Sequence, residues 1–142
     1  MYAVRRNEYL RWVETLPEPE RAGVKPLFRS AIDGEGAAIN WITFEQAERY
    51  CAAIGAKLMS NEQWERTDAA REGINPGGLR TWTSTLTAQG KAIVRGAFTE
   101  MQPDAIKAER PWRQERDTEW TAGVRDPIEK VASREIGMRC AR

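Results

Sequence analysis

The chain has 142 residues, with 22 Lys and Arg against 21 Asp and Glu, and it contains no histidine. A near-neutral chain has no overall field that attracts polyanions, so we expect no nucleic-acid partner. Without histidine, its two cysteines cannot complete an ordinary zinc site, and the most frequent general base at neutral pH is absent, so we expect no cofactor.

The length corresponds to a single domain spanning residues 1–142. No apolar stretch reaches the roughly 20 residues of a membrane span. Charged side chains among the first twelve residues stand where a signal peptide needs an apolar run. We therefore expect a protein that stays in the cytoplasm as synthesised and has no membrane span.

The first predicted element is a short amphipathic helix, Asn7–Leu16, with Asn7 as its N-cap. Its apolar face consists of Tyr9, Trp12, Val13 and Leu16. Pro17 ends the helix. The chain from there to Gly36 is predicted to be a loop, with a brief strand at most around Val24–Phe28.

Two capping boxes predict the starts of two further helices. The boxes are Thr43 with Gln46 and Ser60 with Gln63. The first helix is expected to bury Phe44, Ala47, Cys51 and Ile54 and to end at Gly55. The second helix is expected to contain Trp64 and to end at Gly73.

Strand patterns dominate the second half of the chain. β-Branched or alternating runs bounded by glycines occur at Thr81–Thr85 and Lys91–Arg95, and a last strand is predicted at Glu135–Cys140, able to pair centrally. The segment Thr99–Arg134 is polar and irregular. The pattern predicts an α+β fold with two to three helices packed on short antiparallel strands.

Six ordered segments resemble landmarks of the formylglycine-generating-enzyme family, whose domain has a compact C-type-lectin-like fold. The segments are Tyr2 to Trp12 (similar to V-T-N-x-x-Y-x-x-F), Asn40 to Cys51 (V-S-W-x-D-A-x-x-Y-C), Lys57 to Glu65 (R-L-P-T-E-A-E-W-E), Trp82 to Ser84 (W-T-S), Val94 to Gly96 (V-R-G) and Ile136 to Cys140 (G-F-R-C). In this resemblance Trp41, Trp64 and Trp82 occupy motif positions and are expected in the core.

The resemblance also implies a role for the cysteines, because C-type-lectin-like domains commonly join a cysteine on an early helix to one on the last strand. Cys51 and Cys140 stand at such positions. Two alternatives stay open: a disulfide between them, or two buried free thiols in a reducing cytoplasm.

The chain lacks the residues of the family's chemistry. Formylglycine generation uses a pair of copper-binding cysteines after V-R-G, and a related activity binds iron through histidines; neither set is present. The lectin calcium motifs E-P-N and W-N-D are missing as well. Scattered loop carboxylates (Asp33, Glu35, Asp104, Asp117, Glu119 and Asp126) show no calcium-loop spacing and are interpreted as solvated surface acids.

A binding surface is therefore predicted in the irregular tract instead of an active site. The candidate ligand-binding residues are Phe98, Thr99, Met101, Asp104, Trp112, Arg113, Arg116 and Trp120. Trp and Arg concentrate binding energy at interfaces, so the tract is suited to a protein or glycan ligand, for example on a host-cell surface. The alternative is that Trp112 and Trp120 are core residues.

The sharpest form of this hypothesis resembles the variable proteins of diversity-generating retroelements, found in phages, bacteria and archaeal viruses. In those proteins the C-terminal half displays exchangeable side chains, and the corresponding segment here is Trp82–Cys140. A phage receptor-binding component fits the same residues. The alternatives are a structural virion or assembly subunit that forms homo-oligomers, and a formylglycine-type oxidase with relocated ligands.

Overall fold

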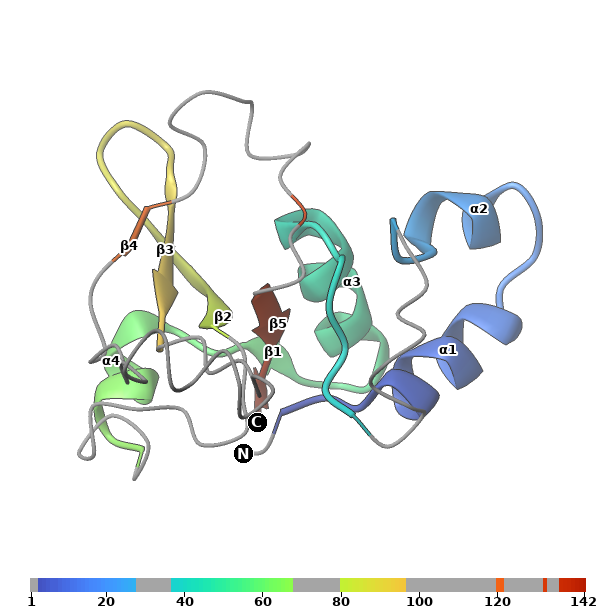
Figure 1. Ribbon diagram of the computed structural model, residues 1–142, viewed down its shortest axis with the longest axis horizontal. Coiled ribbons are helices and arrows are strands. Elements are labelled where there is room, and N and C mark those ends of the chain that lie inside the picture. Colours follow the sequence, from blue (N-terminus) through green and yellow to red (C-terminus); the bar gives the residue numbers. More distant parts are fainter. Residues whose placement is uncertain (1–2, 28–36, 68–79, 97–119, 122–131, 133–135) are drawn as a thin grey trace, which may run out of the picture.

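The structure of the chain, a computed structural model, describes residues 3–27, 37–67, 80–96, 120–121, 132 and 136–142 (Figure 1). The elements are α1 (Arg6–Glu14), α2 (Glu20–Val24), α3 (Phe44–Ala53), β1 (Lys57–Leu58), α4 (Asn61–Glu65), β2 (Arg80–Leu86), β3 (Ala92–Arg95), β4 (Trp120–Thr121), β5 (Ile136–Met138) and β6 (Cys140–Ala141). Short helices and small sheets confirm the predicted α+β class.

The strands form a four-stranded sheet in the order β4-β3-β2-β5 and a two-stranded sheet of β1 and β6. β3 runs antiparallel to β2 and to β4, as predicted. β5, however, runs parallel to β2, with Arg80 opposite Ile136, so the expectation of antiparallel strands is wrong for this pair. The reason is that β5 returns from a distant part of the chain, where no hairpin determines its direction.

The predicted last strand has several partners, but it is central in neither sheet, because β5 stands at the end of the four-stranded order and β6 belongs to a two-stranded sheet. Ala3 bridges to Arg139, and the Val4 amide donates to the Met138 carbonyl oxygen (3.1 Å). On the other side, the Met59 amide donates to the Arg139 carbonyl oxygen (3.0 Å). The predicted strand changes partners at Arg139, and β5 and β6 therefore belong to different sheets.

Helix α1 begins one residue before the predicted N-cap, because an extended segment ends at Arg5. Arg5 bridges to Ala38 and acts as the N-cap, with its amide bonded to the Glu8 carboxylate (3.3 Å). Asn7 is therefore inside the helix. The predicted apolar face is correct: Tyr9 and Val13 are buried, and Trp12 and Leu16 pack against the core.

The prediction of a loop or brief strand after Pro17 is wrong for residues 20–24, which form α2. Val24 is fully buried, and its carbonyl oxygen accepts a hydrogen bond from the Tyr9 hydroxyl. Five residues are too few for a helical period to be visible in the sequence, and burial against α1 stabilises the turn instead.

Both predicted capping boxes are present. Thr43 accepts from the Gln46 amide (3.2 Å) and Ser60 from the Gln63 amide (3.1 Å), and each glutamine bonds back to its cap amide. The predicted ends are less accurate. α4 ends at Glu65 with Arg66 as its C-cap, whereas Gly73 lies outside the described residues.

Helix α3 ends beside Gly55, as expected, with that glycine at a φ of 75°. Ala47 and Cys51 are buried, but Ile54 is 39% exposed, and Tyr50 takes its place on the buried face.

Two of the three motif tryptophans are in the core. Trp64 and Trp82 are fully buried, and the Trp82 indole nitrogen donates to the Ile42 carbonyl oxygen (3.0 Å). Trp41 is only half-buried and has a φ of 59°, so its prediction as a core residue is wrong. Within the described ranges, no helix is long and apolar enough to cross a membrane.

Candidate functional site

The predicted ligand-binding residues fall almost entirely outside the described residues. These are Phe98, Thr99, Met101, Asp104, Trp112, Arg113 and Arg116, and Trp120 is described through its backbone in β4. The structure therefore places the two ends of the candidate tract.

The two ends of this tract are held side by side. β3 leads into the tract, β4 follows it, and the two strands pair antiparallel with Val94 opposite Trp120 and Ile93 opposite Thr121. The strands that flank residues 97–119, here named the recognition segment, are therefore neighbours in the sheet. An antiparallel pair normally needs only a short turn, so the additional residues of the segment are not required to connect the strands.

The exit from β3 is fixed by side chains. Arg95 is only 7% exposed, and its guanidinium donates to the Asn61 side-chain oxygen (2.7 Å) and forms an ion pair with Glu65. Gly96 follows at a φ of 95°, and its carbonyl oxygen accepts from the Arg80 guanidinium (3.0 Å). Glycine adopts this φ without strain, so the chain can turn out of the sheet directly after Arg95.

The partners of Arg95 lie on a helix that is itself well anchored. α4 is capped by Ser60, and the Asn61 amide donates to the Thr85 hydroxyl of β2 (3.0 Å). Trp64 is fully buried, and the Arg139 guanidinium lies over its ring at 5.6 Å. Burial lowers the pKa of Arg139. Packing of α4 on the sheet thus fixes the position of the Arg95 partners.

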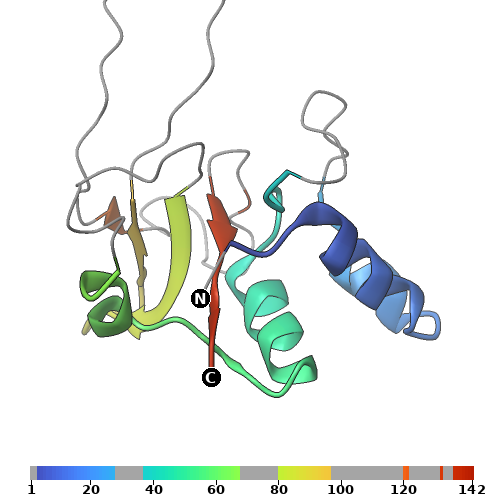
Figure 2. The same cartoon turned by 90° about the horizontal axis from the view of Figure 1, so that it is seen from below.

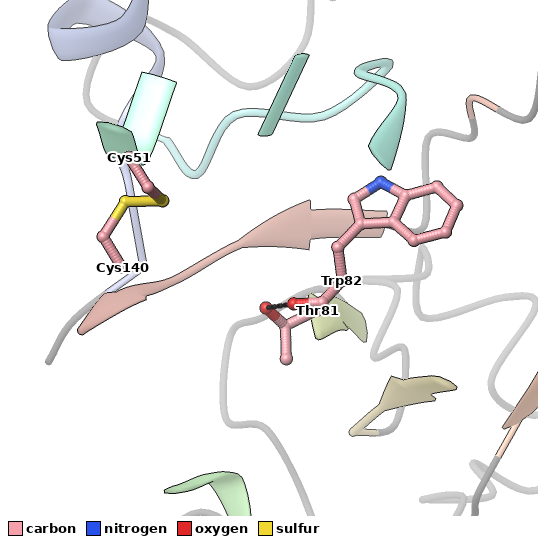
Figure 3. The surroundings of a disulfide bond; sticks show 4 residues. All are labelled: Cys51, Thr81, Trp82 and Cys140. Carbon is pink, nitrogen blue, oxygen red and sulfur yellow. Dashed lines mark hydrogen bonds between the residues drawn. A yellow bond between two sulfur atoms is a disulfide. The ribbon is translucent and has the colours of Figure 1, made fainter. Parts of the chain in front are cut away.

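The cysteines form a disulfide that joins α3 to β6 (Figure 3). The Cα atoms of Cys51 and Cys140 are 5.4 Å apart. Of the two alternatives that the sequence left open, the structure therefore has the bonded one. Cys51 is fully buried, whereas Cys140 is half-buried.

No cluster of three or more Cys, Asp or Glu able to hold a metal ion occurs in the described part of the chain. The loop carboxylates considered for calcium, from Asp33 to Asp126, lie outside it.

A groove of about 820 Å³ is lined in part by the C-terminal residues Ala141 and Arg142. Its lining residues come from α3, β1, α4, β2 and β6 and from the turns between them. Arg49, Lys57 and Arg142 line it. The sequence did not predict this site, because the three cations are far apart along the chain.

The contacts of Arg95 with Asn61 and Glu65, here called the frame, were not predicted from the sequence, although all three residues stand in the segments that resemble the family. Arg95 belongs to the V-R-G segment, and Asn61 and Glu65 belong to the Lys57–Glu65 segment. Their membership in two of the six segments was the only indication in the sequence. That the two segments contact each other is shown by the tertiary structure.

Comparisons of the chain with protein-family models, with curated proteins and with solved structures find no match.

Proposed function

We propose that this chain is a non-catalytic ligand-binding domain of the C-type-lectin-like fold, in the formylglycine-generating-enzyme-like branch. In this proposal the recognition segment between β3 and β4 contacts a protein or glycan ligand. The observation that supports it most directly is the pairing of Val94 with Trp120, reinforced by the buried Arg95. A long segment with both ends fixed on a sheet is a suitable support for recognition side chains.

The arrangement of the termini supports the fold part of the proposal. Ala3, the first described residue, bridges to Arg139 near the C-terminus, and α1 follows directly from this bridge (Figures 1 and 2). The disulfide links the early helix α3 to the last strand, the pattern common in C-type-lectin-like domains.

The state of the cysteines supports a scaffold over an oxidase. Copper-dependent formylglycine generation needs reactive thiolates, and thiolates are also the ligands that bind copper. Cys51 and Cys140 are bonded to each other and connect two core elements. A thiolate site would require breaking a link between α3 and β6.

The specific form of the proposal is a variable protein of a diversity-generating retroelement. Residues such as Phe98, Asp104 and Arg113 would then be exchangeable, whereas Arg95 and Trp120 would be constant because they form the frame. The DNA around the coding sequence tests this directly. We expect a reverse-transcriptase gene and an imperfect repeat of the 3′ coding end; neighbouring tail or capsid genes without them would favour a virion subunit.

Binding can be tested on a glycan array and on intact cells of the strain whose DNA contains the coding sequence. Replacing Trp112 and Arg113 together by Ala should weaken binding at least about tenfold and lower the free energy of unfolding by no more than about 1 kcal/mol. Lys91→Ala, on the β2–β3 hairpin, is the matched control and should bind as the wild type does. Unfolding of the Trp112 and Arg113 variant would contradict the proposal, because it would show that these side chains belong to the core.

A further inference from the structure

The groove near the C-terminal residues has an excess of positive charge. Arg49, Lys57 and Arg142 line it and are all exposed, whereas Glu48 is the one anionic side chain among the described lining residues. Within the described part of the chain, none of these three cations forms an ion pair. The basic groove, defined by these residues, therefore has charge available for an acidic partner.

A second surface has the opposite charge. The connection from α1 to α2, residues 14–20, exposes Glu14, Glu18 and Glu20, and none of them is paired with a cation in the described residues. The neighbouring cation, Arg21, directs its guanidinium to the carbonyl oxygens of Leu16 (3.0 Å) and Glu14 (3.5 Å). We call residues 14–20 the acidic turn.

Two prolines and several hydrogen bonds restrain the acidic turn. Pro17 and Pro19 restrict its backbone, and the Arg21 hydrogen bonds close it from one side. The Tyr9 hydroxyl donates to the Val24 carbonyl oxygen and so joins α1 to α2 behind it. A turn that is already ordered loses little conformational entropy when it binds, which favours its use as a docking element.

The two surfaces cannot meet within one molecule. The connection between α1 and α2 lies at the right edge of Figure 1, away from the C-terminus at the lower centre, and the two are also apart in Figure 2. Their charges can be matched only between molecules.

We propose that the acidic turn of one copy of this chain binds in the basic groove of a second copy. The contact joins two different surfaces, so it is heterologous and forms a head-to-tail row or a ring. Exposed ion pairs are individually weak and are screened by salt, so the association is weak and salt-sensitive.

This association goes beyond ligand binding and is compatible with it. The end of β3, from which the recognition segment departs, is at the top of Figure 2, whereas the C-terminus is at the bottom. Docking at the basic groove therefore leaves the end of β3 uncovered. Several copies in a row would present several such segments, which raises avidity for a repetitive surface.

Sedimentation velocity over a range of protein concentrations tests the proposal. It is measured at about 20 mM salt, where surface charges are weakly screened, and at about 500 mM salt, where they are strongly screened. We expect a concentration-dependent increase in sedimentation coefficient at low salt that disappears at high salt. Glu18→Lys and Lys57→Glu should each weaken self-association at least about tenfold. Lys91→Glu has the same charge change as Lys57→Glu, lies on the β2–β3 hairpin away from both surfaces, and should associate as the wild type does.

Mixing the two single variants gives the most specific result. The Glu18→Lys chain keeps a wild-type groove and the Lys57→Glu chain keeps a wild-type turn, so the mixture should associate although neither variant associates well alone. A chain with both changes should regain self-association through the exchanged charges. Circular dichroism checks that each variant is folded.

Three outcomes would overturn the proposal. The first is a wild-type chain that is monomeric at every concentration in low salt, which would leave the groove to another acidic partner. The second is an equal effect of Lys91→Glu and Lys57→Glu, since net charge alone would then explain the result. The third is a mixture of the two single variants that stays monomeric.

Discussion

The guanidinium of Arg95 on β3 donates a hydrogen bond to the side-chain oxygen of Asn61 at the start of α4, over 2.7 Å. Arg95 also pairs with Glu65 one turn further along the same helix. One nearly buried cation thus connects the strand that leads into the recognition segment with α4, a helix that is also bonded to β2 through Asn61 and Thr85. The stability of this frame can be measured.

Replacing Arg95 by Met retains most of the apolar side chain and removes both polar contacts. We expect the free energy of unfolding to fall by about 2 kcal/mol, because hydrogen bonds to a charged, mostly buried group are among the stronger ones. Urea denaturation measures the change. Arg66→Met is the control, since Arg66 is exposed, and it should change stability by less than about 0.5 kcal/mol. Equal effects of the two substitutions would show that the Arg95 contacts add no stability.

The disulfide closes a loop across most of the chain, with 89 residues of separation between Cys51 and Cys140. By loop-entropy reasoning, its reduction should lower the free energy of unfolding by about 4 kcal/mol. Thermal unfolding with and without a thiol reductant measures this. The chain with both cysteines replaced by Ala should be insensitive to the reductant. A comparable response of that variant would mean that the reductant acts elsewhere.

Replacing Thr43 by Ala removes the oxygen that caps α3. The expected loss of unfolding free energy is about 1 kcal/mol, because the Gln46 amide at the helix start loses its acceptor. The Gln46 side chain is also positioned by this box, and it donates to the carbonyl oxygens of Gly23 and Lys25 (both 3.2 Å). Thr43→Ser keeps the oxygen and should remain close to the wild type in urea denaturation. A Ser variant as unstable as the Ala variant would exclude capping as the cause.

Tyr9 should make the protein less stable at alkaline pH. Burial raises the pKa of its hydroxyl, with Arg49 acting weakly in the opposite direction, so the folded chain holds this proton more tightly than the unfolded chain. The contribution is complete below the unfolded pKa of about 10 and is lost as the pH rises toward the higher folded-state pKa, by up to about 1.4 kcal/mol per pH unit.

Tyr9→Phe is the variant that isolates this effect. It should be less stable than the wild type at pH 8, because the hydrogen bond to the Val24 carbonyl oxygen is lost. Urea unfolding at pH 8, 10 and 11 should show the difference between the two chains narrowing as the pH rises. A difference that stays constant with pH would mean that Tyr9 does not titrate with a raised pKa.

Local sequence determined the starts of α3 and α4 and the pair of strands β2 and β3. Thr43 and Ser60 each stand three residues before a glutamine, and at both positions the two side chains form the capping box that this spacing predicts. The runs at Thr81–Thr85 and Lys91–Arg95 likewise became β2 and β3, because β-branched side chains favour extended backbone. Glycine at position 55 marked the end of α3 for the same kind of local reason.

Features that depend on contacts distant in sequence were decided only by the tertiary structure. Val24 lies in a helix that is too short to show a helical period in the sequence. Arg5, and not Asn7, is the N-cap of α1 because Arg5 itself is extended and bridges to Ala38. The parallel pairing of β2 with β5 could not be read from either strand, since their side-chain patterns are compatible with both directions.

The same division holds for the two surfaces. The composition of the recognition segment could be read from the sequence, but its anchoring by Arg95 and Asn61 depends on the packing of α4 against the sheet. The basic groove depends even more on the tertiary structure, because Arg49, Lys57 and Arg142 come from three separate parts of the chain. Hydrogen bonds within a turn are encoded by a few adjacent residues, whereas charges that meet across a fold depend on the positions of all the elements between them.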